Sequence, residues 1–212
     1  MNHSGIRHKT KSGRRVLETV AAMTLGCVCS GPGAADEARH IAATVCIACH
    51  GEDGNSVIPT IPKIAGLQES YIVKQLRDFR SGSRKSDLMA PVVAALKPED
   101  IGPLAAYYSS RKMRPGRSGD KKAAGFGKMV YLDGNEETGV PACIGCHQPR
   151  GAGHLVYPRI GGQHVEYVTQ EMKEFASGHR SNDYGRFMRV IAKRMNEEEI
   201  HSVAEYLVGL DE

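Results

Sequence analysis

The sequence contains no tryptophan, and aromatic residues make up only 6% of its 212 positions. A chain with so few large apolar side chains has little surface to bury in a hydrophobic core. After residue 35 the sequence also lacks any apolar run that is long enough to span a bilayer. The first absence indicates that something other than aromatic packing fills the interior, and the second predicts a mature chain that is soluble.

Residues 1–35 have the pattern of a secretory signal peptide. Five basic residues and no acidic one precede a mostly apolar run, which a small, turn-rich stretch follows as far as Ala35. We predict export to the periplasm with cleavage near Ala35. A transmembrane anchor fits less well because the run is short and Glu18 interrupts it. Lipoprotein processing at Cys27 is a third reading, but the usual leucine three residues earlier is absent.

Removal of this leader cancels the basic charge of the chain. Lysine plus arginine falls from 28 to 23, and aspartate plus glutamate falls from 24 to 23, so the net charge of +4 becomes zero. The main argument for a nucleic-acid partner disappears with the leader, and we expect none.

The four cysteines that remain all belong to two Cys-x-x-Cys-His strings that lie 97 positions apart. The similarity extends well beyond these strings, first with an offset of 96 and then, after a three-residue insertion, with an offset of 99. Aligned pairs include Pro62 with Pro158, Tyr71 with Tyr167, Phe79 with Phe175, Arg84 with Arg180, Met89 with Met188 and Tyr107 with Tyr206. We therefore predict two homologous domains, residues 36–114 and 125–212, joined by a basic linker at 115–124.

Each half is predicted to be mostly helical with irregular loops. Residues 71–79 and 167–175 show apolar and aromatic positions at helical spacing. Asn196 is placed as an N-cap before three glutamates. Pro98 is expected near a helix start, and Pro103 predicts that this helix begins late or kinks. Halves of this size have limited apolar surface, so we expect a large planar cofactor to supply the missing core of an all-α fold.

Three kinds of chemistry use a Cys-x-x-Cys-His string. A thiol–disulfide site requires alternating strands and helices, which this sequence does not show. A zinc site that pools the four cysteines needs a far shorter spacer than the 93 residues present, and it leaves the histidines without a role. Haem c attachment uses every position, because the thiols add to the two vinyl groups and the histidine ligates the iron. The predicted residues are Cys46, Cys49 and His50 for one haem and Cys143, Cys146 and His147 for the other.

The second axial ligand of each iron should occupy equivalent positions in the two halves. Outside the strings, no two histidines align, and among the mature methionines only Met89 and Met188 do. We predict that these two thioethers ligate the irons, since methionine with histidine is a known haem pairing that raises the potential. The other mature methionines, which are Met113, Met129, Met172 and Met195, are expected to fill the core.

A haem with six ligands has no open position for oxygen, peroxide or substrate. We therefore predict an electron-transfer protein with no catalytic residue and no small-molecule substrate. The aligned Pro62 and Pro158 are expected to accept a hydrogen bond from each proximal imidazole and so fix its tautomer. An ordinary loop turn is the alternative role for these prolines.

The two strings and the segments that follow them resemble the dihaem cytochrome c4 family over essentially all of the mature chain. The segments that carry the resemblance are CIACHGEDGNS, IPKIAGLQESYIVKQLRDFRSGSR, MAPVVAALKPEDIGPLAAYY, GVPACIGCH, GGQHVEYV and EIHSVAEYLVGL. The resemblance implies two class I cytochrome c domains about a pseudo-twofold axis, with haem propionates that approach each other at the interface. It also implies the same ligands by position. Pro103 departs from the uninterrupted final helix of the family, and we expect a local change in the geometry of this helix.

The family serves as periplasmic electron carriers, often membrane-associated, and so the resemblance implies a quinol-oxidising complex and a terminal oxidase as partners. An alternative is the electron-transfer subunit of a sulfur-oxidising dehydrogenase, such as a flavocytochrome sulfide dehydrogenase or a thiosulfate dehydrogenase. A peroxidase would require a vacant sixth position, and the aligned methionines argue against it.

Charge distinguishes the two halves. Residues 36–118 carry 12 basic and 9 acidic side chains, whereas residues 119–212 carry 11 and 14. These balances of +3 and −3 predict a dipolar molecule that turns different ends toward donor and acceptor, unless the charges scatter over solvated helix faces.

Overall fold

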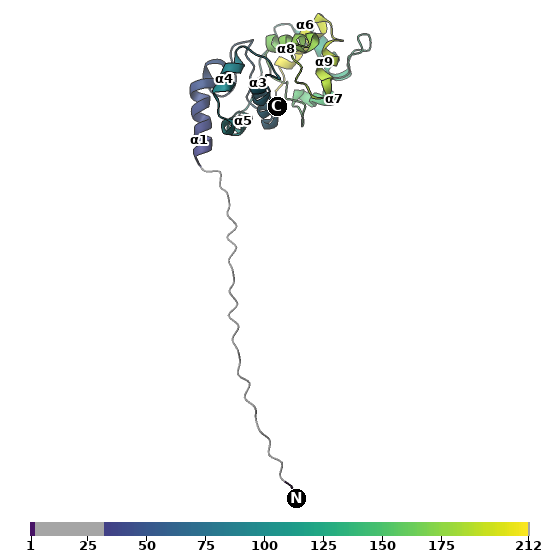
Figure 1. The fold of residues 1–212 in the computed structure, drawn as a ribbon. Helices are drawn as coiled ribbons and strands as arrows, with labels where there is room; N and C mark the ends of the chain where they lie inside the picture. The colour runs from purple at the N-terminus through teal and green to yellow at the C-terminus, as the bar shows by residue number, and fades with distance from the viewer. Residues whose placement is uncertain (3–31, 212) are drawn as a thin grey trace. The chain divides into compact units, whose positions relative to one another are not determined.

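The computed structural model describes residues 1–2 and 32–211, and the regular structure there is helical (Figure 1). The predicted leader lies almost entirely outside the described residues, since only its last four residues belong to a described helix. The helices of the N-terminal half are α1 (Pro32–Ile41), α2 (Ile47–His50), α3 (Glu69–Ser81), α4 (Met89–Ala95) and α5 (Ile101–Ser109). Those of the C-terminal half are α6 (Lys121–Asp133), α7 (Ile144–His147), α8 (Val165–Ser177), α9 (Phe187–Ala192) and α10 (Glu197–Val208).

Short turns complete the described structure. A π-helical turn, η1 (Ala42–Cys46), precedes α2, and the 3-10 turns are η2 (Pro98–Asp100), η3 (Pro149–Gly151) and η4 (Tyr184–Arg186). Extended pairing in the described residues is limited to two isolated bridges, Asn135–Val140 and His154–Tyr157. The prediction of an all-α fold is confirmed. None of the described helices is long and apolar enough to cross a bilayer.

Each half has its own hydrophobic core. In the N-terminal half, Leu104 and Tyr108 of α5 pack with Ile41 of α1. In the C-terminal half, Tyr131 of α6 packs with Leu207 of α10. The equivalent final helices, α5 and α10, therefore each pack against the first long helix of their own half.

Helices α6 and α10 approach closely because Gly127 has no side chain. A Cβ atom at this position would lie 1.8 Å from the carbonyl oxygen of Ser202. Glycine is thus required here by a backbone contact between two helices rather than by a turn.

The helix starts follow the sequence signals. The Asn196 side chain accepts a hydrogen bond from the Glu199 backbone N–H at 2.8 Å, and the Glu199 carboxylate accepts one from the Asn196 N–H at 2.8 Å. This reciprocal cap confirms the predicted start of α10. In the N-terminal half, residues 98–100 form the turn η2 and α5 begins only at Ile101, so the predicted late start is also confirmed.

The predicted linker is shorter in the structure than in the sequence interpretation. Asp120 caps α6 by accepting hydrogen bonds from the Lys122 and Ala123 N–H groups, each at 2.9 Å. Residues 121–124, which we assigned to the linker, therefore form the first turn of α6.

Candidate haem sites and the interface between the halves

Each Cys-x-x-Cys-His string ends in a short helix whose last residue is the histidine. In the N-terminal half α2 continues from η1, and in the C-terminal half Cys143 is the N-cap of α7. The backbone leaves each helix with a positive φ, 77° at Gly51 and 66° at Gln148. About one helical turn separates the two cysteines of a string, so both sulfurs and the following imidazole project from one short segment.

Both histidines are buried and oriented by a proline carbonyl. His50 is 8% exposed and its Nδ1 lies 2.9 Å from the Pro62 carbonyl oxygen. His147 is 7% exposed and its Nδ1 lies 2.9 Å from the Pro158 carbonyl oxygen. A carbonyl can only accept, so Nδ1 carries the proton and donates.

This tautomer leaves Nε2 of each imidazole with a free lone pair. Burial lowers the pKa of both His50 and His147, against the opposing effect of the hydrogen bond to proline, and so favours the neutral ring. Neither Nε2 atom has a hydrogen-bond partner within the described residues. A neutral imidazole whose other nitrogen is held by a carbonyl is the form that binds a metal.

The loop that carries each proline is fixed in the same way in both halves. The Ile64 N–H donates to the Gly54 carbonyl and the Ile160 N–H donates to the Gly151 carbonyl, both at 2.8 Å. Gly54 has a φ of 80°, and a Cβ there would lie 2.9 Å from the backbone nitrogen of Ala65. The repeat therefore preserves the backbone contacts that aim each imidazole.

Met89 and Met188 occupy equivalent places at the N-terminal ends of α4 and α9. Both are half-buried, and neither belongs to the residues that make up or pack against the two cores. By contrast, Met113 and Met195 are core residues with 1% and 9% exposure, and Met172 packs against the second core. The aligned pair thus differs from the core methionines in its surroundings.

The expectation that Met129 fills the core is wrong. Its side chain is 55% exposed on α6. The next two residues, Val130 and Tyr131, are 1% and 0% exposed and occupy the face that packs against α10. One helix cannot turn three successive positions toward the same neighbour, and Met129 takes the solvent side.

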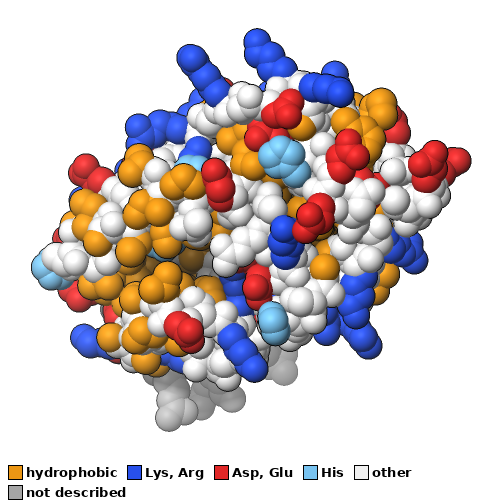
Figure 2. Space-filling model, turned by 90° about the horizontal axis from the view of Figure 1, so that it is seen from above, with side chains coloured by type: hydrophobic (Ala, Val, Ile, Leu, Met, Phe, Trp, Pro, Cys, Tyr) orange, Lys and Arg blue, Asp and Glu red, His pale blue; other side chains and the backbone are white. Residues whose placement is uncertain are grey.

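Exposed apolar side chains lie close in the sequence to both strings and to the aligned methionines. Figure 2 shows a hollow with a largely hydrophobic wall on one face of the molecule. Exposed apolar residues near the strings and the aligned methionines are Val45, Ile47, Val57, Ile58 and Leu88 in the N-terminal half and Leu155, Val156, Tyr184, Phe187 and Val190 in the C-terminal half. Soluble proteins rarely leave such groups uncovered, so the residues present fit a large apolar cofactor in each half.

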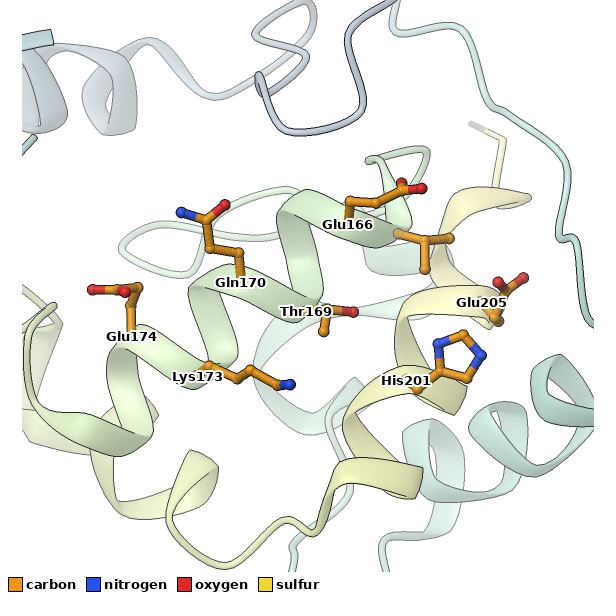
Figure 3. Close-up of a pocket in the computed structure, with 8 residues that line it drawn as sticks. Glu166, Thr169, Gln170, Lys173, Glu174, His201 and Glu205 are labelled. Carbon is orange, nitrogen blue, oxygen red and sulfur yellow. The ribbon is translucent and has the colours of Figure 1, made fainter. Parts of the chain in front are cut away.

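A further groove, between α8 and α10, contains none of the predicted ligands. In Figure 3, Thr169 and Lys173 of α8 point toward His201 of α10. Its lining also includes Glu166, Gln170, Glu174 and Glu205, so several charged side chains surround this groove.

The two halves meet through a buried polar network with approximate two-fold equivalence. Arg84 donates to the Tyr167 hydroxyl at 3.0 Å, and Arg180 donates to the Tyr71 hydroxyl at 3.0 Å. Both arginines also bond Glu171, with Arg84 to Oε1 at 2.8 Å and Arg180 to Oε2 at 2.5 Å. Burial alone would raise the pKa of Glu171, but the two guanidinium groups hold it below the ordinary value.

The equivalent of Glu171 in the N-terminal half is uncharged. Gln75 Oε1 accepts from Arg84 at 2.9 Å and from Arg180 at 3.3 Å. The network therefore places two buried guanidinium groups around one carboxylate and one amide. A second contact is reciprocal: the Lys63 N–H donates to Gln163 Oε1, and Gln163 Nε2 donates to the Lys63 carbonyl, both at 2.9 Å.

The sequence analysis predicts an interface between the two halves but does not predict this polar network. It noted Arg84 with Arg180 and Tyr71 with Tyr167 only as matching positions of the repeat. The sequence nevertheless contains a signal for this network. In each half, a predicted helix carries a tyrosine followed four residues later by a polar residue, so both side chains lie on one face of that helix. Two such polar faces, one from each half, can pack against each other.

The comparison with known proteins gives the same architecture. The cytochrome c family model matches twice, over residues 35–112 and 127–211. Cytochrome c4 of Thiocapsa roseopersicina is 43% identical over 171 residues, which cover 79% of this chain and 88% of that protein. The chain belongs to the cytochrome c4 family. The crystal structure of reduced recombinant cytochrome c4 from Pseudomonas stutzeri has a TM-score of 0.78 at 36% identity, over 83% of this chain and 98% of that one.

A relative whose name states a different role is similar over nearly the same length. The thiosulfate dehydrogenase electron acceptor of Thiomonas intermedia is 35% identical over 200 residues, which cover 92% of this chain and 91% of that protein.

Membership of this family confirms two of the sequence predictions. Two cytochrome c domains in tandem bind two covalently attached haem c groups. Cytochrome c4 proteins transfer electrons, and this chain is an electron-transfer protein of that kind.

Proposed function

We propose that Cys46, Cys49, His50 and Met89 hold the first haem and that Cys143, Cys146, His147 and Met188 hold the second. The observation that carries this proposal is the duplicated arrangement of a buried imidazole held through Nδ1 by a proline carbonyl. We also propose that the two domains extend over residues 36–114 and 121–212, because α6 of the second domain begins at Lys121.

When bound, each haem supplies an iron that gains or loses one electron. The two cysteines of each half fix the position of the group through thioether bonds. His50 and His147 present Nε2 to the metal, and Pro62 and Pro158 keep the proton on Nδ1. The Met89 and Met188 sulfurs would supply the second protein ligand of each iron, so both sites would exchange electrons and bind no substrate.

We propose further that the protein works in the periplasm, loosely associated with the membrane, after removal of residues 1–35. There it carries electrons from a quinol-oxidising complex to a terminal oxidase. The length and order of the match to cytochrome c4 proteins support this role. The opposite charge balances of the two halves support separate docking ends for donor and acceptor.

A second role is favoured by the similarity to a thiosulfate dehydrogenase electron acceptor. In that role the immediate donor is a sulfur-oxidising dehydrogenase rather than a quinol-oxidising complex. The same two haem sites serve both roles, because only the docking partner differs.

The ligand assignment is tested with the exported holoprotein. Its intact mass should include two haems, and its ferric spectrum should show the weak far-red band of methionine–iron ligation. We expect Met89→Ala and Met188→Ala each to remove about half of this band, whereas the exposed control Met129→Ala leaves it intact. A native protein that lacks the band altogether would contradict methionine ligation.

The partner is tested by stopped-flow reduction of the oxidised holoprotein. Rapid reduction by a quinol-oxidising complex, followed by rapid oxidation by a terminal oxidase, supports the respiratory role. Rapid reduction by thiosulfate with its dehydrogenase, and slow reduction by the quinol-oxidising complex, supports the second role.

A further inference from the structure

The peptide group that follows the proline of the second site makes hydrogen bonds at both of its ends. Between Pro158 and Arg159, the carbonyl oxygen accepts from His147 Nδ1 at 2.9 Å, and the N–H donates to Gln68 Oε1 at 2.9 Å. Gln68 belongs to the N-terminal half. One peptide group therefore links the histidine of the second site to a side chain of the other half of the molecule.

The first site has the same series of contacts in the opposite direction. Between Pro62 and Lys63, the carbonyl oxygen accepts from His50 Nδ1 at 2.9 Å, and the N–H donates to Gln163 Oε1 at 2.9 Å. Gln163 belongs to the C-terminal half and is 5% exposed. Each half thus supplies one amide oxygen to the peptide group that orients the histidine of the other half.

Further hydrogen bonds fix the orientation of both glutamine side chains. Gln163 Nε2 donates to the Lys63 carbonyl at 2.9 Å. Gln68 Nε2 donates to the carbonyls of Ala152 and Tyr157, each at 3.3 Å. Because an amide nitrogen can only donate, these contacts direct each amide oxygen toward the peptide N–H.

The two glutamines do not occupy equivalent positions of the repeat. With the offset of 96, Gln68 aligns with His164, and Gln163 aligns with Leu67. The two halves therefore use neighbouring positions of the same loop to reach equivalent peptide groups. Repetition of the sequence does not by itself produce this shared contact.

We propose that Gln163 lowers the reduction potential of the first haem and that Gln68 lowers that of the second, each across the interface between the halves. The inference rests on the proposed ligation by His50 and His147. A hydrogen bond accepted from the peptide N–H polarises that peptide group, so its carbonyl becomes a stronger acceptor for the imidazole Nδ1–H. The imidazole is then a more basic ligand, which favours the oxidised iron. Both glutamines are positioning residues, since they act through the proline carbonyl.

Gln163→Met and Gln68→Met test the proposal because they remove the amide and nearly keep the length of the side chain. The potentials of both haems are measured in the holoprotein by spectroelectrochemistry, with the first haem assigned through Met89→Ala. We expect Gln163→Met to make the first haem easier to reduce by about two- to tenfold in the one-electron equilibrium constant, where tenfold corresponds to about 59 mV. The second haem should not change. Gln68→Met should have the reverse pattern, with a shift of the second haem alone.

A second variant distinguishes hydrogen bonding from packing and covers the case in which the methionine variants do not fold. Gln68→Glu keeps the size of the side chain and supplies a stronger acceptor. It should therefore lower the potential of the second haem below the native value, whereas a loss of packing would shift both Gln68 variants in the same direction. The matched control is Gln170→Met on the exposed side of α8, which should move neither potential.

Three results would overturn the inference and leave the proposed ligands standing. They are unchanged potentials in both methionine variants, a shift only of the haem in the substituted half, and a Gln68→Glu protein whose second haem keeps or exceeds the native potential. A native protein with fewer than two covalent haems, or without the far-red band, would instead contradict the proposed function.

Discussion

Arg84 and Arg180 each reach across to the other half of the molecule, where each donates to a tyrosine hydroxyl at 3.0 Å. The positions are equivalent in the repeat, and so are the tyrosines that they contact. The equivalence stops at the residue between the two guanidinium groups, which is Gln75 on α3 and Glu171 on α8. The stability of the interface therefore depends on one carboxylate, and this dependence gives the first two predictions.

Glu171→Gln should destabilise the protein by about 3 kcal/mol, because it leaves two buried arginines without their carboxylate. The matched control is Glu174→Gln on the same helix. The Glu174 side chain is 40% exposed, and its Oε2 lies 3.8 Å from His179 Nδ1. The free energy of unfolding should therefore fall by less than about 0.5 kcal/mol. Denaturant unfolding of the holoprotein, followed by circular dichroism, measures both changes. Equal effects of the two substitutions would contradict the assigned role of Glu171.

The contribution of Glu171 should also depend on pH. Its pKa in the folded protein lies below the ordinary value of 4.5, so the unfolded chain binds the proton more readily. The stabilisation is therefore complete above about pH 4.5 and is lost as the pH falls through the folded pKa. We expect the difference in unfolding free energy between the native protein and Glu171→Gln to shrink in acid. A difference that stays constant from neutral pH to pH 3 would show that the carboxylate charge does not stabilise the interface.

Gly127→Ala should destabilise the C-terminal half by about 3 kcal/mol, since the added methyl group meets the Ser202 backbone and forces α6 away from α10. The control is Gly125→Ala, two residues earlier on the same helix, where a Cβ meets nothing within 4 Å. That change should stabilise α6 by about 0.5–1 kcal/mol. Thermal unfolding of the two holoproteins should therefore shift in opposite directions, and a shift in the same direction would argue against the close helix contact.

Asn196→Ala should cost about 1 kcal/mol, because it removes the side-chain acceptor of the Glu199 N–H at the start of α10. Asn196→Asp keeps an acceptor and a preferred capping residue, so most of the stability should return. Hydrogen exchange of the amides in the first turn of α10 is the local measurement. Protection there that is unchanged in Asn196→Ala would show that the cap does not hold this helix end.

Local patterns in the sequence were enough to predict the cofactor and the repeat. Haem attachment requires two cysteines and a histidine at fixed spacing, and this spacing can be recognised in the sequence without knowledge of the fold. Alignment of the halves then picked out Met89 and Met188, and Asn196 and Pro98 indicated how the last helices of the two halves begin.

The tertiary structure decided which faces of the helices are buried and against what. Met129 lies on the solvent side of α6 because Val130 and Tyr131 occupy the face toward α10. The residue type alone does not show whether a methionine is buried in the core or exposed to solvent. In the same way, a polar residue such as Gln75 looks solvent-facing until a second helix of the same pattern lies against it. The sequence by itself determined the chemistry of each half, because covalent attachment depends on residue type and spacing. The contact between the halves was decided only in three dimensions, because it depends on which side chains the folded backbones bring within hydrogen-bond distance.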